Sequence, residues 1–193
     1  MARDTEEFES FFHETYPSLC RFLECMLAGG AARASAQDIA QESFLRLHNE
    51  GLGRFPAGEA RFWVYRVARN LALNELTRAG VRQRLFGRVV EAFSRSGGHN
   101  PEQELEMNER RKTVLEMLKS LPEHQRAALL LREQEEMSYR EIADVLGVSE
   151  GKVKVDVFRA RSSLRERWAR AQKTLAAGAA GEASLSGLPK LIL

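Results

Sequence analysis

Apolar residues recur at helical spacing in two runs toward the C-terminal end of the chain, and a short polar break separates them. Ser138 stands before the first run with Glu141 three residues later, the pattern of a capping box at a helix start. Gly147, after the run, can take the left-handed conformation that ends a helix. We therefore predict two helices joined by a tight turn. Their inward faces are Tyr139, Ile142, Ala143 and Leu146 in the first helix, and Val153, Val157, Ala160, Leu164 and Trp168 in the second.

The second of these helices has Ser149 as its expected cap and carries its charge opposite the apolar face. Seven basic residues stand against two acids over residues 152–170, and such a surface binds phosphate with a strong dependence on salt. Helix, glycine turn and basic second helix form the pattern of a helix-turn-helix, whose second helix normally enters the major groove. The alternative is a helical hairpin with a solvated charged face. The basic residues nearest the turn are Lys152, Lys154, Arg159 and Arg161.

The first half of the chain has helical periodicity as well. An apolar stripe runs over residues 8–27, where Pro17 opens a second helix or kinks the first, and Gly29–Gly30 end the segment. Ser35, three residues before Asp38, indicates the cap of the next helix. The polar face of that helix either keeps it soluble or docks on a basic partner surface. This face consists of Asp38, Gln41 and Glu42, and the expected buried face consists of Ile39, Phe44, Leu45 and Leu47.

A glycine-containing loop over residues 51–58 precedes a helix predicted over residues 59–84. Over residues 61–84, six arginines stand against one acid, Glu75. Arginines beside Trp63 and Tyr65 suit single-stranded nucleic acid, because guanidinium groups pair with phosphates while bases stack on rings. A buried tryptophan beside solvated arginines explains Trp63 equally well. The expected packing residues are Phe62, Val64, Val67, Ala68, Leu71 and Leu76.

Residues 86–106 have the Ser-Gly-rich composition of a flexible linker that becomes helical after Pro101. Pro122 then opens a helix, and the Ala/Gly-rich tail over residues 171–193 is expected to be disordered. We predict an all-α chain with two small helical domains, over residues 1–85 and 107–170, on either side of the linker. The inward residues expected around Pro122 are Val114, Leu115, Leu118, Leu121, Ala127, Leu130 and Leu131.

Composition restricts the function mainly by exclusion. The net charge of the 193 residues is only +2, so the nucleic-acid argument depends on where the charge lies. Cys20 and Cys25 lack metal-ligand spacing and are too few for a disulfide framework. Reduced cysteines in a cytoplasmic protein are the main expectation, and a zinc site that also used His13 or His48 is the weaker one. We expect no metal, no cofactor, no membrane insertion and, without a phosphate loop or a nucleophile–base pair, no enzyme.

Three stretches, in this order, resemble the extracytoplasmic-function (group IV) sigma factors of bacterial RNA polymerase, and the resemblance covers roughly residues 8–170. DIAQESFLRL at 38–47 is similar to the polymerase-docking helix of that family. FWVYRVARNLALNELTR at 62–78 is similar to its −10 helix, and residues 118–166 are similar to its −35 domain. The resemblance implies a promoter-specificity subunit, with sigma domain 2 and sigma domain 4 on a tether and no catalysis of its own.

The same resemblance implies partners and residue roles. The partners are core polymerase at its β′ clamp and β flap, promoter DNA, and an anti-sigma factor that clamps the two domains or wedges them apart. Core polymerase would be bound by Asp38, Gln41 and Glu42. The −10 strand would be captured by Arg54, Arg61, Trp63, Asn70, Asn74 and Arg78. The −35 element would be contacted by Ser149, Glu150, Lys152, Lys154, Val155, Asp156 and Arg159.

The chain departs from the family pattern at functional positions. Asn74 stands where the family usually has Asp, and Asp156 stands where Arg is common. An outward Asp156 would repel phosphate, accept from a cytosine amino group or pair with a neighbouring Arg, while Val155 is expected to face outward toward a thymine methyl. The alternative function is a self-sufficient helix-turn-helix regulator that binds duplex DNA unaided. The Arg/aromatic helix over residues 61–84 argues against it, because such a regulator has no need for one.

Overall fold

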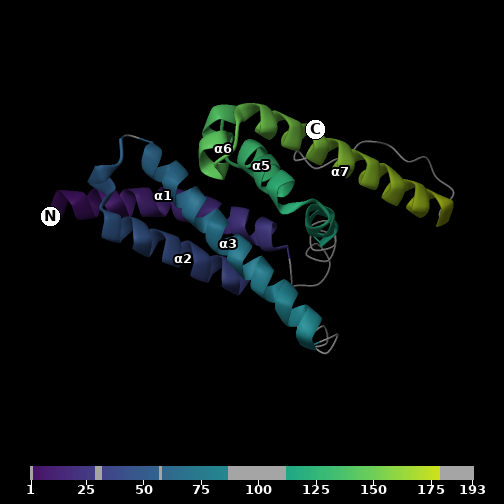
Figure 1. Cartoon of the computed structure of the whole chain (residues 1–193), viewed down its shortest axis with the longest axis horizontal. Coiled ribbons are helices and arrows are strands. Elements are labelled where there is room, and N and C mark those ends of the chain that lie inside the picture. Colours follow the sequence, from purple (N-terminus) through teal and green to yellow (C-terminus); the bar gives the residue numbers. More distant parts are fainter. Residues whose placement is uncertain (1, 29–31, 57, 87–111, 179–193) are drawn as a thin grey trace. The chain divides into compact units, whose positions relative to one another are not determined.

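The computed structural model describes residues 2–28, 32–56, 58–86 and 112–178, which form helices and the turns between them (Figure 1). No strand occurs in these ranges, and the predicted all-α fold class is confirmed. The chain divides into two compact units, Met1–Arg111 and Lys112–Leu193. Gly29–Gly30, nearly all of the expected linker and the end of the expected tail lie outside the described residues.

The first unit contains three long helices that pack against one another in pairs (Figure 1). Apolar residues at helical spacing turn one face of each helix inward, and small alanine side chains on α2 and α3 allow a close approach. The helices are α1 (Ala2–Leu27), α2 (Ala32–Glu50) and α3 (Glu59–Phe86), with a short 3-10 helix η1 (Leu52–Arg54) before α3. The buried side chains include Leu19, Phe22, Leu23, Met26, Ala36, Ala40, Phe44, Leu47, Val64, Tyr65, Ala68 and Ala72.

The contact between α1 and α2 is organised around the ring of Phe44. Its centroid lies 4.9 Å from that of Phe12, 5.9 Å from that of Phe11 and 6.0 Å from that of Tyr16. Phe8 adds an edge-to-face contact at 6.4 Å. Aromatic pairs of this kind contribute about 0.5–1.5 kcal/mol each beyond the area they bury. The cluster fixes the rotation of α2, and with it the direction of the opposite, polar face.

Two local expectations for this unit are wrong, and one of two alternatives is excluded. Helix α1 continues through Pro17, so of the two alternatives for this proline the start of a second helix is excluded. Helix α2 begins at Ala32, so Ser35 lies inside it and is not its cap. Leu45 was expected in the core but is 59% exposed, because Phe44 and Leu47 occupy the inward positions beside it.

The second unit contains a helical segment over residues 112–119 and three further helices, which contact one another in pairs. Pro122 directly precedes α5, as predicted. The three helices are α5 (Glu123–Glu133), α6 (Tyr139–Leu146) and α7 (Glu150–Gly178). The core includes Leu118, Leu121, Ala127, Leu130, Leu131, Met137, Ile142, Val145, Val153, Val157, Ala160 and Leu164.

The predicted caps of the helix-turn-helix are present in α6 and α7. The Ser138 hydroxyl accepts from the Glu141 backbone N–H at 3.2 Å, and the Glu141 carboxylate accepts from the Ser138 N–H at 2.6 Å. Gly147 ends α6 with φ 68° and donates its N–H to the Ala143 carbonyl. The Ser149 hydroxyl accepts from the N–H of Lys152 at 3.3 Å. The turn is therefore fixed by hydrogen bonds at both of its ends.

An ion pair between Arg161 and Glu133 joins α7 to α5. Arg161 was expected on the exposed basic face, but it is half-buried because it reaches across to this acid. Helix α7 then continues to Gly178. The first part of the tail expected over residues 171–193 is thus helical.

Candidate nucleic-acid interface and docking face

The exposed face of α2 is acidic and polar. Asp38, Gln41 and Glu42 are all exposed at positions i, i+3 and i+4, which lie together on a helix surface. Glu42 also pairs with Arg46, whose Nε lies 2.8 Å from the Glu42 carboxylate. At i+7 from Asp38, Leu45 extends the same face with an apolar side chain. These residues form one surface on a helix whose rotation is fixed from behind, and we call Asp38, Gln41, Glu42 and Leu45 the docking face.

Tyr16 and Cys20 of α1 border the docking face. Burial raises the pKa of the Tyr16 hydroxyl, and its hydrogen bond with Cys20 acts in the same direction, whereas its hydrogen bond with Gln41 lowers it. Burial likewise raises the pKa of the Cys20 thiol. Gln41 is therefore supported by a neutral hydroxyl, and its position is set by α1 as well as by α2.

Helix α3 brings four of the six expected −10 residues to one side. Trp63, Asn70, Asn74 and Arg78 are separated by seven, four and four positions, so they lie along one face of the helix. The asparagines and Arg78 are exposed and Trp63 is half-buried. Arg61 lies two positions before Trp63, and side chains two apart on a helix do not face each other. The structure therefore separates Arg61 from the other four residues.

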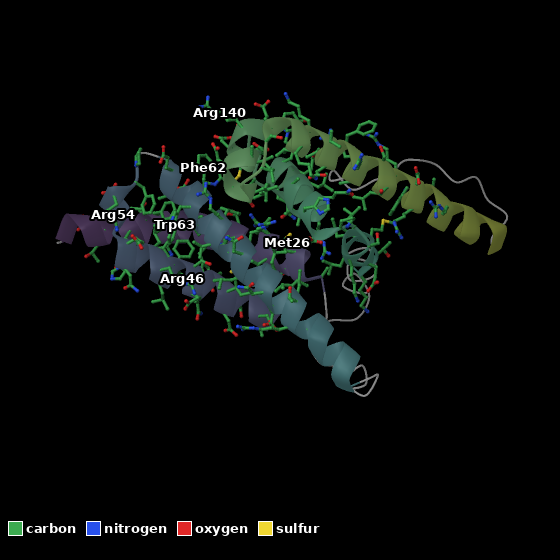
Figure 2. The ribbon with its side chains drawn as sticks, viewed as in Figure 1. Met26, Arg46, Arg54, Phe62, Trp63 and Arg140 are labelled. Atoms are coloured by element: carbon green, nitrogen blue, oxygen red, sulfur yellow. The ribbon has the colours of Figure 1, made fainter. Side chains whose placement is uncertain are left out.

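Arg54 and Trp63 lie toward the same end of the first unit, away from Met26 (Figure 2). The ring of Phe55, which follows η1, lies 5.5 Å from the Trp63 ring, and this contact brings the loop against α3. Arg54 is exposed and forms a 2.5 Å ion pair with Glu50. An exposed pair of this kind contributes little, so a phosphate can compete for the Arg54 guanidinium.

Tyr65 does not join this surface. It is fully buried, its ring centroid lies 5.4 Å from that of Phe22, and its hydroxyl lies 3.1 Å from that of Ser18. The expectation that Tyr65 stacks on bases is therefore wrong, because the residue belongs to the core. The Cζ atom of Arg61 lies 5.8 Å from the same ring. Trp63 is left as the aromatic residue of α3 that combines partial exposure with a place on the Asn70–Arg78 face.

In the second unit, Lys154 lies on the exposed side of α7. Its ammonium lies 2.7 Å from the Glu150 carboxylate and 5.7 Å from the centre of the Tyr139 ring. The hydrogen bond with Glu150 and the charge of that acid raise the pKa of Lys154. Both members of the pair are about half exposed, so solvent screens their attraction and the lysine can exchange partners.

The structure corrects the placement of Asp156. Its side chain is 3% exposed, so the outward orientation expected of this residue is wrong. Both carboxylate oxygens accept hydrogen bonds from Lys152 Nζ, at 2.6 and 2.5 Å. His124 of α5 places Nε2 3.7 Å from the same carboxylate. One of the alternatives for Asp156 was pairing with a neighbouring arginine, whereas the residue that pairs with it is the lysine one helical turn earlier.

The remaining exposed part of α7 combines apolar and basic side chains. Val155 is exposed, as predicted, and Phe158 is 70% exposed three residues later. Arg159 is also exposed, and the described residues include no partner for its guanidinium. Ser149 and Glu150, at the helix start, are exposed as well. This end of α7 presents Lys154, Val155, Phe158 and Arg159 on a helix of the size that enters a DNA major groove.

Comparisons with known proteins match both units. The family model for sigma-70 region 2 matches residues 11–82, and the model for sigma-70 region 4 matches residues 111–164. The RNA polymerase sigma-H factor of Pseudomonas aeruginosa is 37% identical over 67% of this chain and 70% of its own length. The ECF RNA polymerase sigma-E factor of Haemophilus influenzae is 32% identical over 74% of this chain and 79% of its own length. The chain belongs to the sigma-70 family.

It is an RNA polymerase sigma factor of the extracytoplasmic-function group, and it directs promoter-specific transcription initiation together with core polymerase. The fold agrees with a co-crystal structure of the sigma factor RpoE and the anti-sigma factor NepR from Bartonella quintana. That chain matches with a TM-score of 0.59 and 22% identity, over 83% of this chain and 96% of its own. The sigma family consists of transcription initiation factors.

Sequence reasoning missed three exposed apolar residues of this sigma factor, Leu45, Val148 and Phe158. Leu45 lies between Phe44 and Leu47, so periodicity alone did not separate it from the core. Phe158 had a clear signal, because it falls outside the inward stripe that contains Val157 and Ala160.

Cys20 and Cys25 are both present as half-buried thiols in α1. Among the described residues of the sigma factor, no group of three or more His, Cys, Asp or Glu side chains is placed to hold a metal ion. A search of the described helices finds none that is both long and apolar enough to cross a membrane.

Proposed function

We propose that the docking face of α2 binds core polymerase at its β′ clamp. The observation that carries this proposal is the shared exposure of Asp38, Gln41 and Glu42 on a helix whose opposite side is locked into the aromatic cluster. Two carboxylates and an amide suit a basic partner surface. Leu45 adds apolar area that would be covered in such a complex.

In the same unit, the Trp63, Asn70, Asn74 and Arg78 face of α3 would capture bases of the non-template −10 strand. Trp63 offers a ring for stacking, the asparagines offer donors and acceptors to base edges, and Arg78 offers charge to the backbone. Arg54 would approach phosphate from the adjacent loop. Arg61, on a different side of α3, would contact the strand only where its path turns around the helix. Stacking of this kind offsets the cost of unpairing bases.

In the second unit, the start of α7 would enter the major groove at the −35 element, with Ser149, Glu150, Lys154, Val155 and Arg159 at the surface. The same unit would contact the β flap. The chain would supply binding and positioning and no catalysis, and it would act in the cytoplasm with polymerase and DNA. Control by an anti-sigma factor is supported by the fold shared with the RpoE chain that was crystallised with NepR.

The test is co-elution of the full chain with bacterial core RNA polymerase on a sizing column. Wild-type protein should co-elute, and an Asp38→Lys, Glu42→Lys double variant should not. Glu6→Lys, Glu9→Lys is the matched control, because it reverses the same charges at exposed positions of α1 in the same unit. Co-elution of the docking-face variant would contradict the proposed site. Tight duplex binding by the chain alone, without co-elution, would favour a self-sufficient regulator.

A further inference from the structure

The first two turns of α7 contain two ion pairs that differ in burial. Glu150 and Lys154 are both about half exposed, whereas Lys152 pairs with a carboxylate that is almost completely buried. A phosphate can displace the first pair at little cost, since water already screens it. The second pair resists displacement, because losing Lys152 would leave the Asp156 charge in the protein interior with one remaining neighbour.

The burial of Asp156 follows from its place on the helix. It lies three residues after Val153 and four before Ala160, both fully buried, so its side chain leaves α7 at the margin of the inward face. There it meets His124 from the first turn of α5, with Nε2 3.7 Å from Oδ1. The carboxylate is thus contacted from two helices, and it accepts two hydrogen bonds from a single ammonium group.

These contacts restrict where the Lys152 ammonium can go. Its Nζ is within 2.6 Å of both carboxylate oxygens, so the ammonium is directed at Asp156 while 46% of the Lys152 side chain stays exposed. Lys154 is tied only to an exposed acid, and Arg159 is exposed without a described partner. The positive charge available to DNA at this end of α7 therefore comes from Lys154 and Arg159.

We propose that Asp156 is a positioning residue of the −35 surface, which withholds the Lys152 ammonium from DNA phosphates and leaves Lys154 and Arg159 to supply the charge there. The inference rests on the proposed placement of α7 at the −35 element. It assigns Lys152, which the sequence placed among the DNA contacts, to the link between α7 and α5. It also explains why an acidic residue, Asp156, stands on the DNA-binding helix at a position where a basic residue would be expected.

The test measures how the affinity of holoenzyme for DNA depends on salt. The holoenzyme contains the full chain and bacterial core polymerase, and the probe is a duplex pool that the wild-type holoenzyme selects from fragments with a randomised −35 region. Asp156→Asn keeps the side-chain shape and releases Lys152. One additional phosphate contact should steepen the slope of log K against log salt by about 0.9. Glu150→Gln, which removes an equal charge from the exposed pair, should change the slope less.

Two further variants show whether a steeper slope in Asp156→Asn comes from release of the Lys152 ammonium or only from loss of the negative charge of Asp156. Lys152→Met should leave the wild-type slope nearly unchanged, and Lys152→Met with Asp156→Asn should abolish the steepening. The inference is overturned if Asp156→Asn leaves the slope unchanged, if the steepening persists without Lys152, or if Lys152→Met alone flattens the slope by about 0.9. The neutral double variant removes both charges together, so it keeps the comparison valid if Lys152→Met alone does not fold.

Arg159→Ala distinguishes failure of this inference from failure of the proposed function. It should flatten the slope, because it removes an exposed cation from the same surface. If Arg159→Ala has no effect, α7 does not lie on the DNA, and the proposed −35 role and this inference are both overturned. If it flattens the slope while Asp156→Asn does nothing, only the inference fails. Thermal unfolding of the chain alone should show that the effects of Lys152→Met and Asp156→Asn on stability are not additive in the double variant. Additive effects would show that Lys152 and Asp156 do not interact.

Discussion

The hydroxyl of Tyr65 lies 3.1 Å from the hydroxyl of Ser18 and joins α3 to α1 inside the first unit. Ser18 directs its single hydroxyl proton to the Thr15 carbonyl at 3.0 Å, so Tyr65 is the donor between the two hydroxyls. Tyr65→Phe keeps the ring and removes this bond, and it should lower the free energy of unfolding by about 0.5–1.5 kcal/mol in urea titrations. Promoter opening by the folded variant should stay intact, because the Tyr65 ring is fully buried in the core of the unit. If Tyr65→Phe has the wild-type free energy of unfolding but does not open the promoter, Tyr65 belongs to the −10 surface after all.

Leu45 and Leu47 provide a matched pair on α2. Leu45 is exposed on the docking face and Leu47 is fully buried. Leu45→Ala should weaken binding to core polymerase while the free energy of unfolding changes by no more than about 0.5 kcal/mol, the usual range for surface positions. Leu47→Ala should instead cost about 2–5 kcal/mol of stability. Polymerase titrations and urea unfolding of both variants check this, and unchanged polymerase affinity of Leu45→Ala would remove Leu45 from the docking face.

Gly147 joins the two helices of the DNA-binding motif with φ 68°, and a Cβ added there would meet nothing within 4 Å. The cost of Gly147→Ala is therefore conformational and not steric, about 1–2 kcal/mol for a non-glycine residue in the left-handed region. Gly147→Asn should cost less, since asparagine tolerates this conformation better. Thermal melts of the two variants should keep this order. Equal melting temperatures for alanine and wild type would show that the turn relaxes.

The Cys20 thiol should titrate above its ordinary pKa of 9.0, because burial disfavours the thiolate. In a Cys25→Ser variant, the rate of alkylation by iodoacetamide follows the thiolate population. Its midpoint should lie at higher pH in the native protein than in urea. Restricted access slows the reaction without moving the midpoint, so coincident midpoints would contradict the burial of Cys20.

The raised pKa of Cys20 also makes the free energy of unfolding depend on pH. The folded state holds the Cys20 proton more tightly than the unfolded state does, so this stabilisation is complete below the unfolded pKa. It is lost as pH rises through the folded pKa. Urea unfolding of wild type above pH 9 should therefore show a decrease that Cys20→Ser lacks.

Local sequence was sufficient to predict the helix-turn-helix in detail. Ser138, Glu141 and Gly147 act on neighbours within a few residues, so their hydrogen bonds follow from spacing alone. The face of α2 that carries Asp38, Gln41 and Glu42 was likewise predictable, because helical periodicity separates it from Ala40, Phe44 and Leu47.

The predictions from sequence were wrong where a residue far away in the chain helps to decide whether a side chain is buried or exposed. Tyr65 is buried because its hydroxyl meets Ser18, which lies on another helix and far away in sequence. Asp156 turns inward because Lys152 neutralises it and α5 brings His124 beside it. Ser18 and His124 cannot be recognised from the local pattern, since both interpretations of Tyr65 and Asp156 satisfy the same helical spacing, whereas Lys152 is a local neighbour four residues before Asp156.

The two ion pairs at the start of α7 also affect the time that the holoenzyme spends away from its promoters. Over residues 150–156 two lysines balance two acids, and Asp156 holds one of the lysines, so within this segment Lys154 is the cation left to meet the phosphates that any DNA offers. Non-promoter DNA supplies only that kind of attraction, whereas base edges in the correct groove can also engage Val155 and Arg159. Encounters with the wrong sequence should therefore be brief, and the genome's many competing sites should retain less of the holoenzyme.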